Sequence, residues 1–184
     1  MKRIASRLAL VLFFVALTVP LASARAASRS QIARDSRAAL HRLYSKNESA
    51  RKLGETAKAV LVFPKIIKAG FIIGGQGGQG ALFENGRIVA YYNIGSASYG
   101  LQAGVQRYGY ALFFMTDGAL DYLRKSDGWE IGTGPSVVLV DEGVARSVST
   151  TSAREDIYAF SFSQEGLMAG IGIQGSKITR IHPR

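Results

Sequence analysis

The chain has 184 residues, of which 47% are hydrophobic, 20% charged and 10% aromatic, and its formal net charge is +10. This length accommodates one domain, and the apolar fraction excludes a wholly disordered chain. The chain has no cysteine and two histidines, His41 and His182, which excludes disulfides and argues against a metal centre or catalytic triad built on these residue types. We therefore expect no metal and no cofactor.

Residues 1–26 have the pattern of a secretory signal peptide. Lys2, Arg3 and Arg7 form a positive n-region, residues 8–19 form an apolar run, and small residues around Ala24 fit a cleavage site. The apolar run is shorter than the roughly 20 residues needed to span a bilayer. We expect export to the periplasm or the medium, with residues 27–184 as the mature protein.

Residues 27–58 are expected to form a basic helical arm, broken near residues 45–47. Residues 28–57 contain no proline and one glycine and are rich in Ala, Arg, Lys and Leu, which favour helix. Helical spacing places Arg34, Arg37 and Lys52 broadly opposite a narrow apolar stripe and Lys46 near its edge. The stripe comprises Ile32, Ala39, Leu43, Ala50, Leu53 and Ala57.

Two interpretations of this arm remain open. It is either an amphipathic helix lying on an anionic membrane surface or a helix packed on the body with its charged face in solvent. We favour packing for the apolar face, because the stripe is rich in alanine and lacks Trp and Phe. The basic face remains available for binding in either case.

The positive charge is concentrated in the arm. Residues 28–58 carry eight basic and three acidic residues, whereas residues 59–184 carry eleven basic and ten acidic residues. Each Lys or Arg close to anionic headgroups contributes about 1 kcal/mol of attraction. Nucleic acid is not an expected partner, because the basic segment lacks interleaved aromatic residues and an exported protein meets little nucleic acid.

From residue 59 onward the sequence changes to short β-type runs separated by glycine. Residues 59–63 read as a strand ended by Pro64, residues 71–73 and 80–83 flank a glycine-rich turn, and Asn85-Gly86 predicts a hairpin. Asp117 is expected to cap a short helix over residues 118–125. Further strands are expected at 88–92, 98–106, 108–115, 136–140, 146–150, 157–162, 167–173 and 177–181.

The fold class that follows is α+β. It consists of a helical arm, residues 27–58, followed by a mainly antiparallel, glycine-rich β-sheet or barrel-like body, residues 59–184, with one short helix.

Residues 75–80 match the G-x-G-x-x-G pattern of dinucleotide-binding folds. That motif requires a helix directly afterwards and an acidic residue about 20 positions further on. A predicted strand follows instead, and residues 95–100 contain no carboxylate. Nucleotide binding is therefore not expected. The scattered carboxylates match no calcium loop, and no catalytic arrangement stands out, so we expect the protein not to be an enzyme.

Lys65 and Lys68 flank an apolar pair, Ile66-Ile67, just before the glycine-rich segment. A loop of this kind is suited to entering a bilayer interface while its lysines meet lipid phosphates. Alternatively, the isoleucines return to the core and the segment is a connection between strands. The sequence does not decide between the two.

Several motifs, in order, resemble the SYLF domain family. Residues 57–65 and 68–71 with the glycine-rich segment 74–80 match its opening, and the resemblance extends from about residue 32 to residue 178. The later motifs are Tyr91-Tyr92-Asn93, residues 98–104, 111–115 and 158–161, and Gly166-Leu167-Met168-Ala169-Gly170.

The resemblance implies a lipid-binding module. Eukaryotic members bind phosphoinositides, some bind actin filaments, and their membrane binding is attributed to a basic amphipathic N-terminal segment. The counterpart here is residues 32–58, with an anionic phospholipid surface as the expected partner. This chain differs in having an export signal and no second domain. The candidate lipid-binding residues are Arg34, Arg37, Arg42, Arg51, Lys52, Lys58, Lys65 and Lys68.

The alternative hypothesis is a structural or stress protein of the cell envelope that acts through protein–protein contacts. An exposed strand edge in the glycine-rich sheet would offer a partner such a contact. The sequence leaves the oligomeric state open.

Overall fold

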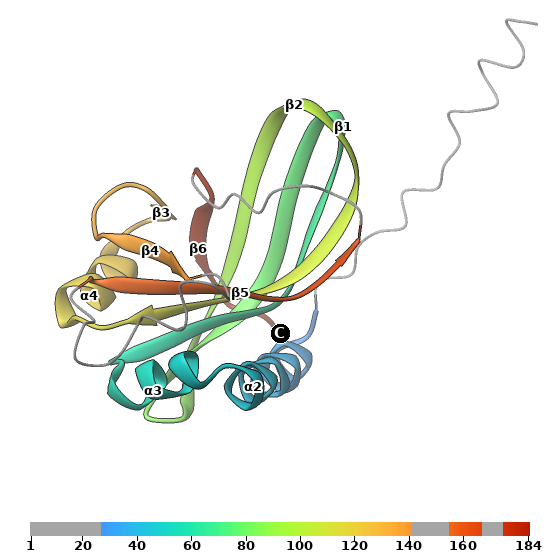
Figure 1. Ribbon diagram of the computed structural model, residues 1–184. Helices are drawn as coiled ribbons and strands as arrows, with labels where there is room; N and C mark the ends of the chain where they lie inside the picture. Colours follow the sequence, from blue (N-terminus) through green and yellow to red (C-terminus); the bar gives the residue numbers. More distant parts are fainter. Residues whose placement is uncertain (1–26, 141–154, 167–174) are drawn as a thin grey trace, which may run out of the picture.

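The computed structural model describes residues 27–140, 155–166 and 175–184 (Figure 1). Two helices precede a curled, mainly antiparallel sheet, which confirms the α+β class. The predicted signal peptide and the strands predicted at 146–150 and 167–173 lie outside the described residues. The helices are α2 (Arg29–Lys46), α3 (Glu48–Thr56) and α4 (Asp117–Lys125). The strands are β1 (Ala59–Glu84), β2 (Arg87–Phe114), β3 (Trp129–Glu130), β4 (Val137–Val140), β5 (Ile157–Gly166) and β6 (Lys177–Ile181).

The predicted break in the helical arm lies at Asn47. Its backbone is extended, its N–H donates to the Leu43 carbonyl, and its side chain accepts a hydrogen bond from the Ala50 N–H at 2.8 Å. One residue thus ends α2 and caps α3, which is a role that the short amide side chain of Asn favours. The third helix, α4, is capped by Thr116 and not by Asp117, which is its first residue.

Strands β1 and β2 form one long antiparallel ribbon. They are paired from Ala59 opposite Phe114 to Glu84 opposite Arg87. The turn between them is the predicted hairpin, with φ of +48° at Asn85 and +74° at Gly86, the left-handed values that a tight type I′ turn requires.

The ribbon bends back over itself, as Figure 1 shows at its upper end. At the bend, a Cβ on Gly70 would lie 2.6 Å from the Cα of Gly74. Further along, a Cβ on Gly78 would lie 2.6 Å from the Lys65 carbonyl oxygen, and one on Gly80 would collide with the Val62 carbonyl. The two halves of β1 therefore approach backbone to backbone, which only glycine permits.

Three expectations for this region were wrong. Pro64 does not end the first strand, because it lies at the irregularity in pairing between Phe63 and Ile66, where no ladder hydrogen bond is required of it. Residues 74–80 form no turn, since they stay paired with residues 92–98 throughout. Residues 98–106 and 108–115 are likewise not separate strands but parts of β2, which ends at Phe114.

The remaining strands extend the sheet from the other edge of β2. Strand β6 pairs with residues 91–95 and β5 with residues 106–114, both antiparallel. Strand β3 then adds to β6, and β4 adds to β5 in parallel. The sheet thus curls around its own interior while α2 and α3 lie against its outside (Figure 1).

Alternating residues of the ribbon supply two cores, as expected for a sheet buried on both faces. Leu61, Phe63, Tyr92 and Tyr110 pack inside the curl together with Trp129. On the opposite face, Val60, Val62, Phe83, Phe113 and Phe160 pack beneath the helices against Ile32, Leu43 and Leu53.

Candidate functional site

Helix α2 is held on the sheet by the predicted apolar stripe. Ile32, Ala39 and Leu43 are buried, and so is Ser36, whose hydroxyl donates to the Val62 carbonyl at 3.4 Å. Ala50 and Leu53 continue the buried stripe on α3. The packed interpretation of the apolar face is therefore confirmed, and the basic side chains of α2 are exposed.

We define the α2 basic face as Arg34, Arg37, Arg42 and Lys46, which are all exposed. Among the described residues, none of the four forms an ion pair with a carboxylate. The only acid of the helix, Asp35, accepts a hydrogen bond from the Gln31 amide at 2.8 Å. Four positive side chains thus project from the exposed surface of α2, with a single exposed carboxylate among them.

Arg34 and Arg37 each make one additional contact. The Arg34 guanidinium donates to the Gln31 side-chain oxygen at 2.9 Å, an i,i+3 contact within the helix. The Arg37 guanidinium lies over the Phe83 ring, 5.8 Å from its centroid, and donates to the Gly86 carbonyl at 3.5 Å. Arg37 therefore fastens the helix to the β1–β2 turn in addition to carrying charge.

The candidate cations of α3 and its C-terminal end lie in ion pairs. Arg51 contacts Glu55 at 2.7 Å, Lys52 contacts Glu48 at 2.8 Å, and Lys58 contacts Asp117 at 3.3 Å. The hydrogen bond and charge of Lys52 lower the pKa of the Glu48 carboxyl. A neighbouring carboxylate thus offsets the positive charge of each of these three side chains, in contrast to the cations of the α2 basic face.

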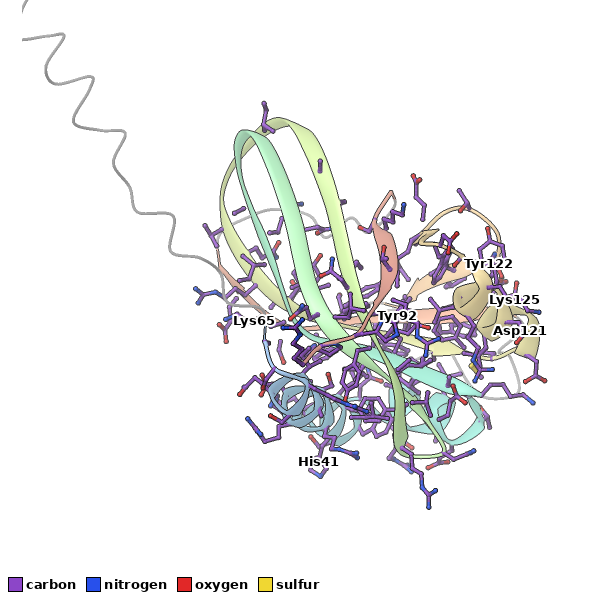
Figure 2. All side chains as sticks on the ribbon, turned by 180° about the vertical axis from the view of Figure 1, so that it is seen from behind. His41, Lys65, Tyr92, Asp121, Tyr122 and Lys125 are labelled. Atoms are coloured by element: carbon purple, nitrogen blue, oxygen red, sulfur yellow. The ribbon has the colours of Figure 1, made fainter. Side chains whose placement is uncertain are left out.

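Lys65 and Lys68 lie within strand β1 and not in a loop. Ile66 is fully buried between them, as the core interpretation expects, whereas Ile67 is 42% exposed. Lys65 is exposed, and Figure 2 shows it between α2 and the bend of the ribbon.

The sequence prediction missed exposed cations on α2 and on β2. Arg29, in the first turn of α2, lies with its guanidinium 5.5 Å from the centroid of the Tyr91 ring. Lys46 was expected near the edge of the apolar stripe, and it is exposed in the last turn of α2. Arg107 lies on β2 directly opposite Ile67. Only the pairing register brings Arg107 beside Lys65 and Lys68, so no local pattern in the sequence identifies it.

The titratable groups inside the curl are tyrosines. Burial raises the pKa of Tyr108 to about 12, and its hydroxyl donates to the Gln76 side-chain oxygen at 2.6 Å. Burial raises the pKa values of Tyr92 and Tyr110 as well. Each of these phenols therefore remains neutral at ordinary pH.

No group of three or more His, Cys, Asp or Glu side chains among the described residues is arranged to hold a metal ion. No helix within the same residues is long and apolar enough to cross a membrane.

The C-terminal half of the chain is similar to a known protein family. Residues 95–182 match the family model Ysc84, described as a Las17-binding protein actin regulator. A comparison with curated proteins found no match. The matched residues begin within β2 and include β5 and β6, so helix α2 lies outside them. The match over residues 95–182 agrees with the resemblance to the SYLF domain family that the sequence motifs indicate.

Proposed function

We propose that this protein binds anionic phospholipid surfaces through the α2 basic face and acts without catalysis. The observation that carries the proposal is the contrast between neighbouring helices. The cations of α2 face solvent without carboxylate partners among the described residues, whereas those of α3 are paired. Unpaired cations retain the attraction for phosphate groups that an ion pair largely cancels.

Three further points support this proposal. Residues 27–184 contain 19 basic and 13 acidic residues, and this formal net charge of +6 favours anionic partners. The family resemblance implies lipid binding through an N-terminal basic segment. Residues 1–26 have the pattern of an export signal, so the membrane surface in question would be one of the cell envelope, on which the protein would be peripheral.

Two triple variants with the same change of net charge test the proposal. Arg34→Gln/Arg42→Gln/Lys46→Gln removes unpaired cations from the α2 basic face, while Arg51→Gln/Lys52→Gln/Lys58→Gln removes the three paired cations. Arg37 is left unchanged because it contacts Phe83 and Gly86. At about 1 kcal/mol for each cation near the headgroups, the first variant should bind roughly 100-fold more weakly.

The measurement is co-sedimentation with phosphatidylglycerol, cardiolipin, phosphoinositide and neutral vesicles at low salt. We expect the α3 variant to bind within a few-fold of the wild type. Equal losses in both variants would show that net charge alone drives binding and would contradict a site on α2. Absence of binding to every vesicle would favour the alternative, a protein partner in the envelope.

A further inference from the structure

The far end of the β1–β2 ribbon exposes apolar side chains. We define the ribbon bend as residues 67–73 of β1 with their partners, residues 99–107 of β2. Within it, Ile67 is 42% exposed, Val105 53% and Ile73 68%. Isolated exposed isoleucines are ordinary in soluble proteins, but a group of them at one projecting end indicates a contact surface.

The charged side chains around these apolar residues are mostly positive. Residues 59–83 and 88–116 contain no Asp or Glu, and their three cations are Lys65, Lys68 and Arg107. All three lie at or beside the ribbon bend. The nearest acid in the pairing register is Glu165 of β5, opposite Arg107, and the two do not form an ion pair. Apolar side chains bordered by cations complement an anionic bilayer interface.

Hydrogen bonds hold the base of the ribbon bend. Gly70 and Gly74 allow its tight reversal, and beneath it Tyr108 donates to Gln76, which donates to Ser176 at 2.9 Å. These hydrogen bonds tie both halves of the ribbon to the start of β6.

The ribbon bend and the α2 basic face lie at opposite ends of the molecule. Figure 1 and Figure 2, which view it from opposite sides, both show α2 at the lower end and the ribbon bend at the upper end. His41, an exposed residue of α2, lies at the lower margin of Figure 2. One flat bilayer therefore does not contact both surfaces of the same molecule.

We propose that the ribbon bend is a second lipid-binding surface, so that one molecule links two anionic bilayers. This inference rests on the proposed function of the α2 basic face. Ile67, Ile73 and Val105 enter the interfacial region of one bilayer while the cations beside them meet its phosphates, and α2 lies on the other bilayer.

Vesicle clustering tests this directly. Phosphatidylglycerol vesicles are mixed with wild-type protein, with Ile73→Glu, or with Val89→Glu, and clustering is followed by light scattering beside co-sedimentation. Val89 is a matched control, because it is 47% exposed on the same ribbon but lies next to the Asn85-Gly86 turn, away from the bend. We expect Ile73→Glu to co-sediment through α2 but to cluster vesicles about tenfold more slowly or less, and Val89→Glu to match the wild type.

Each result has a distinct meaning. If the wild type co-sediments without clustering vesicles, or if Ile73→Glu clusters them as well as the wild type, the inference is wrong while the proposed function stands. If the wild type does not co-sediment, both are wrong.

A second measurement detects contact with lipid at the bend itself. The chain has no cysteine, so Ile73→Cys and Val89→Cys each provide a single site for an environment-sensitive fluorophore. We expect the probe at position 73 to brighten with anionic vesicles and the probe at position 89 to stay unchanged. Clustering without brightening at position 73 would contradict insertion of the bend.

Discussion

Asp156 joins three parts of the structure through one carboxylate. It accepts hydrogen bonds from the Ser136 N–H at 3.2 Å and hydroxyl at 3.3 Å, just before β4, and from the Thr116 hydroxyl at 3.0 Å, at the N-terminus of α4. Its own backbone carbonyl accepts from the Met115 N–H at 2.9 Å. The backbone hydrogen bond from Ser136, followed by that from the Thr116 hydroxyl, lowers the pKa of the Asp156 carboxyl.

We expect Asp156→Asn to lower the free energy of unfolding by about 1 kcal/mol near neutral pH, since it weakens hydrogen bonds to a partly solvated charge. Because the pKa is lower in the folded state, this stabilisation is complete above the unfolded-state pKa of about 3.9 and is lost as the pH falls through the folded value. Urea unfolding of both proteins from pH 7 down to pH 3.5 measures it. A difference that stays constant below pH 4 would contradict the assignment.

Within β1, the crossing of its two halves depends on glycine. Gly80 leaves no room for a Cβ beside the Val62 carbonyl, and a backbone atom cannot move aside as a side chain can. Gly118 in α4 has nothing within 4 Å of its Cβ position. The two positions therefore differ in the space around them and are suited to a matched comparison.

We expect Gly80→Ala to destabilise the protein by about 1–3 kcal/mol through overpacking. Gly118→Ala should be neutral or stabilise it by up to about 1 kcal/mol, because alanine favours helix. Denaturant unfolding of the two variants beside the wild type measures both effects. Equal stability of Gly80→Ala and the wild type would mean that the two halves of β1 do not approach as closely as described.

The elements differ in how far the sequence predicts them. The helical arm follows from its 3.6-residue period and from Asn47, both of which are local signals. The Glu48–Lys52 and Arg51–Glu55 pairs have i,i+4 spacing, so the neutralisation of the α3 cations was also readable from the sequence. The continuity of β1 through Pro64 and residues 74–80 was not readable, because it depends on pairing with residues of β2 that lie 12 or more positions further along the chain.

For the molecule as a whole, the α2 basic face and the ribbon bend are separated in space. The sequence predicted one lipid site in which the basic arm and the Lys65–Lys68 segment act together. The fold places the α2 basic face at one end and the ribbon bend at the other (Figure 1). This separation arises from the reversal of the ribbon, which brings residues near 70 and 104 to a common tip, and no pattern within either segment indicates it.

The central claim is that unpaired cations draw this protein to anionic lipid, and the salt dependence of binding tests it most directly. Wild-type protein is titrated with phosphatidylglycerol vesicles and with neutral vesicles between low salt and about 0.5 M salt, where screening acts over only a few ångströms. We predict tight binding to the anionic vesicles at low salt, a loss of at least about tenfold on raising the salt, and little binding to neutral vesicles. Binding that is insensitive to salt, or equal for both kinds of vesicle, would contradict the account.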